Sequence, residues 1–502
     1  MATDLEQARE WVDKLYMRLA KRRPAVEKFF KYFEGDQPLV YASPQWKEFH
    51  GSRYEGFSDN WCGVVARSAV DRMRIDGFRL SDSTERLTAD EQQLWTDWNR
   101  NEMGSLSSQG FLTASVAKRA YTLVWGNDDD APVVSWEHPD QVIIDHGPLG
   151  DRRRALKVWM DEDGQEYATL YTPEALWKFQ RQGYAVASNI VNDREGNRTS
   201  SGLYLPRTYA SAGGWEPRIV GDEPWPLPNP LGVVPVVEWQ NLPMLGGYPI
   251  SSISGTMAGQ DAINLLWAYL FNAADYASMP ARVVTGAEPP KVPVLDENGQ
   301  VVGSRPAKLE DLAQGRLLFL PGKNGARNPN IGQWDPAKLD VFGNEVTRIL
   351  GHIAAQTGTP GHYLLTNEKF ANLNGDALTA AEVPLVTKVG RQELDFNPAA
   401  KETVALMALV RGKVTLARAI REAEGRRFVQ WKNPAMHSES QIADAATKDR
   451  AVGMSMRTVF ERRYGMTEPE IEQEMRRIRE EQTDPILAEI FKGAGVGADA
   501  GA

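Results

Sequence analysis

Cysteine is scarce in this sequence of 502 residues, and histidine is scattered. The one cysteine, Cys62, cannot form a disulfide within the chain, which predicts a protein of a reducing compartment. Cys62 follows Trp61 in an apolar stretch, where a small buried side chain is favoured over a nucleophile. None of the six histidines has the spacing of zinc ligands. We therefore expect no metal site.

Long hydrophobic runs are also missing. The longest, Leu265 to Phe271, is too short to cross a bilayer. Residues 1–6 have neither the basic nor the apolar segment of a signal peptide. The sequence therefore predicts a soluble, intracellular protein without a membrane partner.

A phosphate-binding loop and a positive net charge are absent as well. Gly322-Lys323 is followed by Asn and Gly412-Lys413 by Val, so neither completes the ATP-binding pattern G-x-x-x-x-G-K-[S/T]. The formal net charge of −10 argues against tight, sequence-independent binding of nucleic acid, because such binding needs clustered cations. We expect neither an enzyme nor a bound cofactor.

Helical patterns dominate the first hundred residues. Residues 4–34 have apolar side chains along one side, and Pro24 predicts either two helices or a bent one. The Lys21-Arg22-Arg23 cluster in this stretch is interpreted as a solvated helix face. Residues 59–74 and 90–101 predict two further helices.

β structure is predicted from Leu123 onwards. Residues 156–160 and 167–171 flank Gly164 and predict a hairpin, because glycine permits a positive φ in the turn. Residues 233–239 predict a buried strand. Pro235 places this strand at the edge of a sheet, since proline cannot donate to a central ladder.

Two long helical segments enclose a small insert in the middle of the chain. The first, 252–279, is apolar nearly all round, which requires neighbours on every side, inside a large protein or between subunits. The second starts at Asp335-Pro336, a helix cap followed by proline at the first helical position, and ends at Gly358. Residues 281–335 predict a small α/β insert, so the two helices must run antiparallel.

An asparagine-rich run, 366–375, precedes another long helical pattern. That pattern starts at Asp376 and contains Pro384, which predicts a kink because proline removes a backbone donor. We therefore predict an exposed loop held out from a stiff support. Residues 438–490 are helical again, and the Gly/Ala tail that follows is predicted to be flexible.

Several colinear segments are similar to those of one family. They are Tyr32–Gly35, Asn60–Cys62 with Asp71–Phe78, Asn229–Asn241, Thr359–Leu364, Asn374–Glu382 and Lys388–Gln392. In these segments the chain resembles the portal proteins of tailed bacteriophages. Those proteins form the ring at the unique capsid vertex through which double-stranded DNA is packaged and ejected. The order and spacing of the segments carry the resemblance, and no single segment is diagnostic.

The resemblance implies a fold and a division of the chain. The fold class is α+β and mainly helical, with wing, stem, clip and crown regions. The implied regions are a wing at 1–251, stem helices at 252–280 and 336–361, a clip at 281–335, a tunnel loop at 362–375, a kinked long helix with further wing at 376–437, a crown at 438–490 and a flexible tail at 491–502.

The resemblance also implies partners and a location. The chain would form a homo-oligomeric ring, expected to be a dodecamer, with double-stranded DNA in its channel. It would bind the terminase large subunit, a head–tail adaptor, and the major capsid and scaffolding proteins. We expect it in the virion at the portal vertex, after assembly in the host cytoplasm. Since the ATP-binding loop is missing, the packaging motor must be a separate terminase.

Candidate residues follow from the implied regions. The tunnel-loop set is Asn367, Lys369, Asn372 and Asn374. Asparagine can contact phosphates without the ion release that strengthens lysine contacts, so DNA could slide past a sparse ring of Lys369 side chains. The set expected to pack between stem helices of neighbouring subunits is Leu266, Trp267, Phe271, Phe342, Val346 and Ile349. The set expected to contact partners from the clip is Arg305, Lys308, Arg316 and Trp334.

Two alternatives remain open from the sequence. One is a DNA-packaging enzyme, a terminase-like nuclease or ATPase, which an ATPase assay on the purified protein would identify. The other is a different structural capsid protein. Shell proteins, however, lack long antiparallel helices around a small insert, and adaptors are much shorter. A ring with a central hole in negative-stain images would separate a portal protein from both.

Overall fold

The computed structural model describes most of the chain, and it divides the chain into two compact units. The described residues are 2–37, 39, 43, 57–80, 87–127, 129–162, 164–182, 214–246, 248–278, 282–285, 291–295, 300–306, 317–320, 330–333, 338–365, 375–435, 439–466 and 468–483. The first unit comprises Met1–Glu34, Trp61–Gly255 and Ala355–Ala502. The second comprises Gly35–Asn60 and Thr256–Ala354.

Four helices open the first unit. They are α1 (Ala2–Glu34), α3 (Trp61–Val70), α4 (Ala89–Arg100) and α5 (Met103–Ala117). The predicted N-terminal helix is confirmed as one element that contains Pro24. Helix α4 begins with a capping box, in which the backbone N–H of Glu91 donates to Oγ1 of Thr88 at 3.2 Å and the Glu91 carboxylate accepts from the Thr88 N–H at 2.7 Å.

The interpretation of Lys21-Arg22-Arg23 as a solvated face is wrong for its two arginines. Arg22 donates to the hydroxyl of Tyr121 at 2.8 Å and to the carbonyls of Pro139 and Val142. Arg23 donates to the carbonyl of Asp140 at 2.9 Å. These arginines satisfy carbonyls of a turn more than a hundred residues later, a role that charge spacing along one helix cannot reveal.

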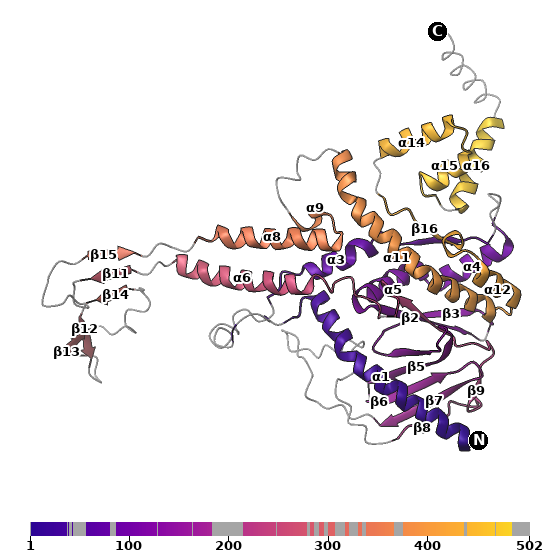
Figure 1. The fold of residues 1–502 in the computed structure, drawn as a ribbon, viewed down its shortest axis with the longest axis horizontal. Helices are drawn as coiled ribbons and strands as arrows, with labels where there is room; N and C mark the ends of the chain where they lie inside the picture. Colours follow the sequence, from indigo (N-terminus) through magenta and orange to yellow (C-terminus); the bar gives the residue numbers. More distant parts are fainter. Residues whose placement is uncertain are drawn as a thin grey trace, which may run out of the picture. The chain divides into compact units, whose positions relative to one another are not determined.

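Antiparallel sheets follow the opening helices. Strands β2 (Arg119–Gly126), β3 (Pro132–Glu137) and β10 (Val236–Gln240) form a three-stranded sheet in the order β10-β2-β3. Strands β4 (Val142–His146), β5 (Arg152–Met160), β6 (Gln165–Tyr171), β7 (Ala175–Gln182), β8 (Glu216–Pro217) and β9 (Leu227–Pro228) form a six-stranded sheet. Strand β1 (Ile75–Phe78) pairs with β16 (Val429–Trp431). Helix α1 lies along the six-stranded sheet (Figure 1) and packs on it through Val12, Leu15 and Leu19.

Two β predictions are confirmed. Strands β5 and β6 form the predicted hairpin, and Gly164 in its turn has a φ of +82°. Strand β10 lies at an edge of its sheet, as predicted, but it starts at Val236, three residues later than predicted and directly after Pro235.

The core of the first unit forms around a long helix, α11 (Gly375–Val410), followed by α12 (Val414–Glu422) and α13 (Gly425–Phe428). Phe396 of α11 stacks on Phe111 with ring centroids 5.4 Å apart, and the hydroxyls of Thr403 and Thr122 are 2.8 Å apart. At Gly110 of α5, an added Cβ would lie 2.2 Å from the Trp136 ring, so this close approach requires glycine. Helix α11 contains Pro384, as predicted, and it also contains Pro398.

Three helices end the described part of the chain: α14 (Glu439–Ala451), α15 (Met456–Arg462) and α16 (Glu468–Thr483). Arg463, just after α15, pairs with Asp449 of α14 at 2.5 Å. The predicted helical character of this region is confirmed for these residues.

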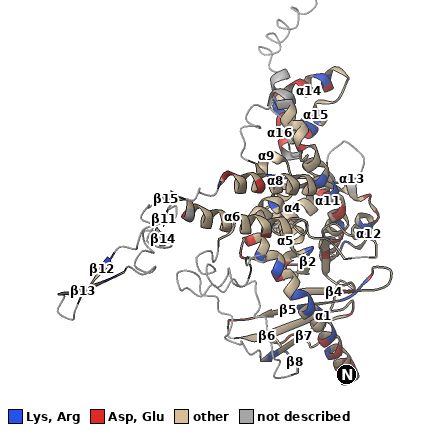
Figure 2. Ribbon diagram, turned by 60° about the vertical axis from the view of Figure 1, so that its left-hand side comes forward, with Lys and Arg blue, Asp and Glu red and all other residues tan. Residues whose placement is uncertain are grey.

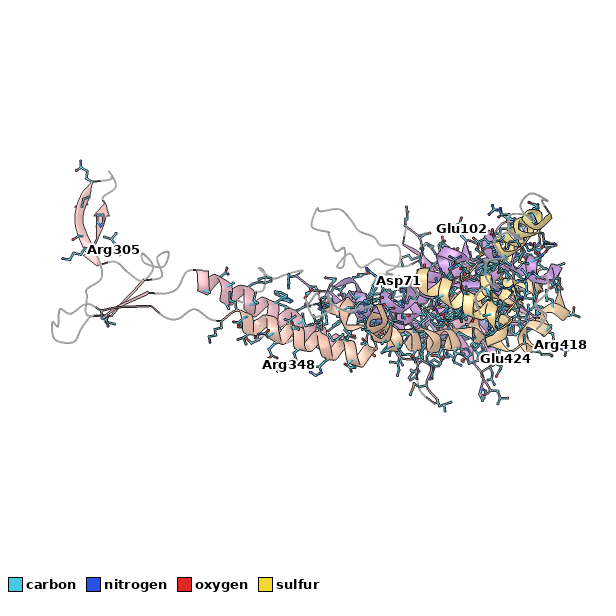
Figure 3. The ribbon with its side chains drawn as sticks, turned by 90° about the horizontal axis from the view of Figure 1, so that it is seen from above. Asp71, Glu102, Arg305, Arg348, Arg418 and Glu424 are labelled. Atoms are coloured by element: carbon cyan, nitrogen blue, oxygen red, sulfur yellow. The ribbon has the colours of Figure 1, made fainter. Side chains whose placement is uncertain are left out.

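The second unit has two long helices, α6 (Met257–Ser278) and α8 (Asp340–Thr357), which we call the helix pair. They lie side by side in both views (Figures 1 and 3). A Cβ added to Gly259, near the start of α6, would lie 3.0 Å from Ile353, near the end of α8. The opposite ends of both helices join the insert, so the pair runs antiparallel, as predicted.

The described residues of the insert form strands. Strand β11 (Arg282–Thr285) pairs with β14 (Leu317–Leu320) in parallel and with β15 (Asn330–Gln333) in antiparallel orientation. Strands β12 (Lys291–Leu295) and β13 (Val301–Pro306) form a hairpin. The sequence missed β11 and β15, and no helix occurs among the described residues of the predicted α/β insert.

The limits of α8 differ from prediction at its start alone. Asp335 and Pro336 lie outside the described residues, and Lys338 and Leu339 are not helical, so α8 begins at Asp340. It ends at Thr357 as predicted, followed by Gly358 with a φ of +65°, a left-handed conformation that glycine adopts without strain.

Candidate functional site

Residues 57–60 are held on α6 by side-chain hydrogen bonds. Oδ1 of Asn264 accepts from the backbone N–H of Asp59 at 3.1 Å and from Nε2 of Gln260 at 3.0 Å. Nε1 of Trp267 donates to Oδ2 of Asp59 at 2.8 Å. Gln260 and Asn264 are 0% and 1% exposed. The buried side of α6 is therefore partly polar, which corrects the prediction of a helix that is apolar nearly all round.

The predicted stem-packing residues all lie on the helix pair. Val346 is buried, whereas Leu266, Trp267, Phe271, Phe342 and Ile349 are only half-buried in the single chain. Trp267 and Phe271 stack on each other with ring centroids 5.8 Å apart. Helix α6 contains two acidic residues, no lysine and no arginine, and its ribbon is almost uniformly uncharged in Figure 2. The single chain thus leaves apolar side chains of both helices half exposed, and on α6 their surroundings are nearly uncharged.

One of the predicted clip residues lies in the described part of the insert. Arg305 is near the end of β13, opposite Val292 on β12 (Figure 3). Lys308, Arg316 and Trp334 lie outside the described residues. The structure therefore places a single member of this set, on a hairpin strand.

The predicted tunnel-loop residues Asn367, Lys369, Asn372 and Asn374 lie outside the described residues, but the elements on both sides of them are described. Helix α9 (Gly361–Leu364) precedes this stretch, and α11 follows it. We call residues 365–375 the connection. Its two neighbouring elements meet at one arginine, which lies in the turn after α3.

That arginine is Arg72. Its Nη2 donates to the hydroxyl of Tyr363 on α9 at 2.6 Å and to Oε1 of Glu382 on α11 at 2.9 Å. The Tyr363 hydroxyl is also 3.2 Å from the same carboxylate oxygen, and Nη1 donates to the carbonyl of Pro434 at 3.1 Å. We call Arg72, Tyr363 and Glu382 the arginine clamp.

The arginine clamp is largely shielded from water. The side chains of Arg72 and Glu382 are 8% and 11% exposed. Burial by itself would lower the pKa of Arg72, but hydrogen bonds to Glu382 and Tyr363 outweigh it and raise that pKa. The guanidinium therefore stays charged, and a charged donor strengthens both hydrogen bonds.

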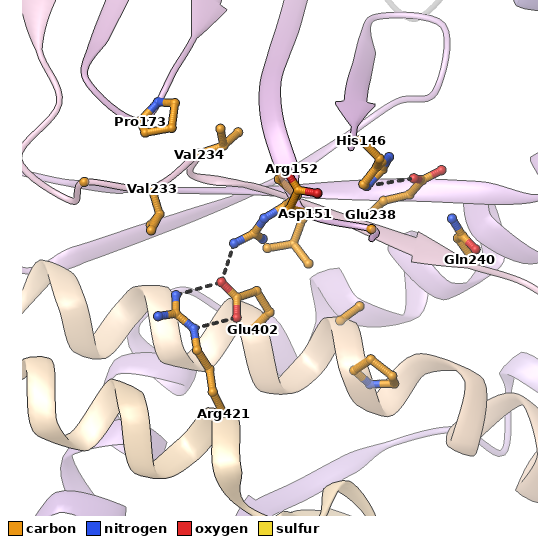
Figure 4. A pocket seen from close by; sticks show the side chains of 15 residues that line it. His146, Asp151, Arg152, Pro173, Val233, Val234, Glu238, Gln240, Glu402 and Arg421 are labelled. Atoms are coloured by element: carbon orange, nitrogen blue, oxygen red, sulfur yellow. Dashed lines mark hydrogen bonds and ion pairs between the residues drawn. The ribbon is translucent and has the colours of Figure 1, made fainter. Parts of the chain in front are cut away.

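A cavity of about 540 Å³ lies elsewhere in the first unit, with a triad of charged side chains in its wall (Figure 4). Glu402 accepts from Nε and Nη2 of Arg421, each at 2.8 Å, and also pairs with Arg152. Burial tends to raise the pKa of Glu402, but the two arginines hold it below its ordinary value. Both arginines pair with the one carboxylate, as expected for a structural ion-pair network.

No group of three or more histidine, cysteine, aspartate or glutamate side chains is arranged to hold a metal ion in the described part of the chain. Among those residues, no helix is both long and apolar enough to cross a membrane.

Sequence reasoning missed Arg72, Tyr363, Glu382 and Asp59. Arg72 lies 291 residues from Tyr363 and 310 from Glu382, and Asp59 lies 208 from Trp267. The spacing of residues in a sequence motif cannot predict contacts between residues so far apart in the chain. One signal was present, because Arg72, Tyr363 and Glu382 all fall within segments on which the family resemblance rests.

The described residues define a protein of the α+β class, with a long helix pair, a β insert and charged groups that are paired in its packing. Comparison with protein families then identifies the class. The chain belongs to the family described as "Phage portal protein, SPP1 Gp6-like", which it matches over residues 13–485 of 502. The family is structural, serves DNA packaging and is located at the capsid vertex of bacteriophages. A comparison with curated proteins gives no match.

Proposed function

We propose that this portal protein forms a closed ring in which the helix pair packs against copies of itself around a DNA channel. The observation that carries the proposal is the half-buried apolar surface of the pair, which includes Leu266, Phe271, Phe342 and Ile349. A head-to-tail interface between identical subunits would cover such a surface and close on itself. The low charge of α6 favours burial of this kind, because uncharged surface has a small cost of desolvation.

Within this ring, we assign 1–251 and 376–437 to the wing, 252–280 and 336–361 to the stem, 281–335 to the clip and 438–490 to the crown. The clip would contact the terminase large subunit and then the head–tail adaptor, and Arg305 on its hairpin is the described candidate contact. Capsid and scaffolding proteins would bind outside the channel, in a ring we expect to be a dodecamer assembled in the host cytoplasm. The chain would hydrolyse no ATP, which an ATPase assay on purified rings tests directly.

We assign residues 362–375 to the channel wall, with Lys369 as one cation per subunit and the three asparagines as weak phosphate contacts. Weak contacts suit a duplex that must slide, because each lysine–phosphate contact releases counterions and strengthens binding. The arginine clamp supports this assignment, since it ties the elements on both sides of the connection to the core of the first unit.

Replacing Lys369 with alanine tests the channel assignment. We expect rings of Lys369→Ala to form normally in negative-stain images, while the amount of DNA packaged or retained changes. The matched control is Lys448→Ala on α14, whose side chain is 74% exposed and pairs with Asp444. Loss of the ring in Lys369→Ala, or packaging equal to that of the control, would contradict a role in the channel.

A further inference from the structure

We propose that Arg72 is a positioning residue that fixes the distance between the two ends of the connection, residues 365–375. The consequence for DNA passage rests on the proposed channel function, but the positioning itself does not. Three contacts converge on one guanidinium: Tyr363 before the connection, Glu382 after it, and the carbonyl of Pro434. Tyr363 and His362 of α9 also lie 3.2 Å and 3.6 Å from the same Glu382 oxygen, so the contribution specific to Arg72 is to tie both elements to Pro434 and to the turn after α3.

Arg72 is mounted on a rigid part of the first unit. It follows α3, whose Val65, Ala66 and Ala69 are at most 1% exposed, and it precedes β1, which pairs with β16. Neighbouring Met73 is buried in the main core cluster with Phe428. The guanidinium therefore extends from a well-packed part of the core, and from there it holds the segments that carry Tyr363, Glu382 and Pro434.

Arginine is required at this position by geometry as well as by charge. Nη1 and Nη2 donate in different directions, to Pro434 on one side and to Tyr363 and Glu382 on the other. Lysine would keep the positive charge but offers one nitrogen on a flexible chain, so it cannot reproduce the planar fork. Arg72→Lys should thus retain the charge balance of the site and lose its geometry.

Hydrogen exchange on assembled rings, followed by mass spectrometry, tests this proposal. In Arg72→Lys we expect amide exchange in residues 361–365 and 375–385 to become faster by about tenfold or more. Local opening of these segments costs less free energy once it no longer has to break the hydrogen bonds to Arg72. The control is Arg181→Lys. Arg181 is 6% exposed at its side chain and donates to the buried Glu166 at 2.6 Å in the six-stranded sheet. The control should not change exchange in those two segments.

A second variant guards against a general loss of stability. Tyr363→Phe removes one hydroxyl and keeps the ring in place, so we expect faster exchange on α9 and a smaller change on α11. The proposal is overturned if exchange in both segments is as slow in Arg72→Lys as in the wild type. It is also overturned if exchange rises equally in Arg181→Lys.

Packaging by Arg72→Lys rings separates this proposal from the channel function. Faster exchange together with altered DNA retention supports both. Faster exchange with unchanged packaging supports the positioning role of Arg72 and contradicts the assignment of the connection to the channel.

Discussion

Trp267 and Asp59 are joined by a hydrogen bond of 2.8 Å between Nε1 and Oδ2, although 208 residues separate them in the chain. The same aspartate presents its backbone N–H to Asn264. The segment that leads into α3 is therefore part of the second unit, and α6 needs it to satisfy buried polar groups.

This relationship predicts the effect of changing Asp59. Asp59→Ala leaves the Trp267 N–H without its acceptor, and we expect the free energy of unfolding to fall by about 1–2 kcal/mol. Asp59→Asn keeps an acceptor oxygen at the same place and should cost less than half as much. Urea unfolding of the two variants provides the comparison, and equal losses would show that charge rather than hydrogen bonding matters here.

Lys388 on α11 predicts an unusual dependence of stability on pH. Its Nζ is buried and has no hydrogen-bond partner among the described residues, and burial lowers its pKa from 10.5 to about 8. The unfolded chain therefore binds more protons than the folded chain between these two values, so the free energy of unfolding rises with pH across that window. Below pH 8 the full penalty applies, roughly 3 kcal/mol from the size of the shift.

Lys388→Met tests this directly. We expect the variant to be more stable than the wild type near neutral pH and to lose the rise in stability between pH 8 and pH 10.5. Lys448→Met, at an exposed position, serves as the control and should follow the wild type. A slope with pH that is the same in all three proteins would contradict the burial of an unpaired ammonium.

The charged triad of Figure 4 predicts a loss of stability in acid. Because the folded chain holds the pKa of Glu402 below its ordinary value, its contribution is present at neutral pH and is lost as pH falls through the acidic range. Glu402→Gln should leave Arg152 and Arg421 without a counter-charge and cost about 2 kcal/mol or more.

Acid titrations of unfolding check the triad. The wild type should lose stability more steeply with falling pH than Glu402→Gln does. A triple variant with apolar side chains at all three positions should recover part of the loss, since no charge then remains buried. Parallel acid curves for wild type and Glu402→Gln would exclude a structural role for the triad.

Two glycines of α5 make a matched pair for the core. Gly110→Ala would place a methyl group 2.2 Å from the Trp136 ring, and we expect a loss of about 2–3 kcal/mol from the forced shift. Gly104→Ala, in the same helix, meets nothing within 4 Å and should stabilise the protein by about 0.5 kcal/mol. Melting temperatures of the two variants should therefore move in opposite directions. A similar effect of both would contradict the packing of α5 on β3.

Much of the fold could be predicted from the sequence where local chemistry decides. Gly164 fixed the β5–β6 turn, Pro235 marked an edge strand, and Gly358 ended α8, because each depends on backbone conformation alone. Strands β11 and β15 were missed although β14 has the same length of four residues: β14 is the uninterrupted apolar run Leu317–Leu320, whereas β11 and β15 include polar residues and, in β15, a glycine.

The site was harder to predict than the fold. Gln260 and Asn264 were hidden in an apolar run because their partner, the 57–60 segment, is distant in the chain. Arg22 and Arg72 were indistinguishable by sequence from surface arginines, since both owe their burial to carbonyls and carboxylates that folding alone brings near them. The assignment of Leu266 and its neighbours to a subunit interface stays a prediction.

Imaging of the purified protein tests the central claim most directly, with Leu266→Lys beside the wild type. We predict closed rings with a central hole for the wild type, with helix pairs side by side around that hole. Leu266→Lys should fail to close the ring while its subunits remain folded. Arg348→Ser, at an exposed position on α8, should form rings as the wild type does. A wild-type protein that stays a monomer, or rings in which the apolar face of α6 is exposed to water, would contradict the account.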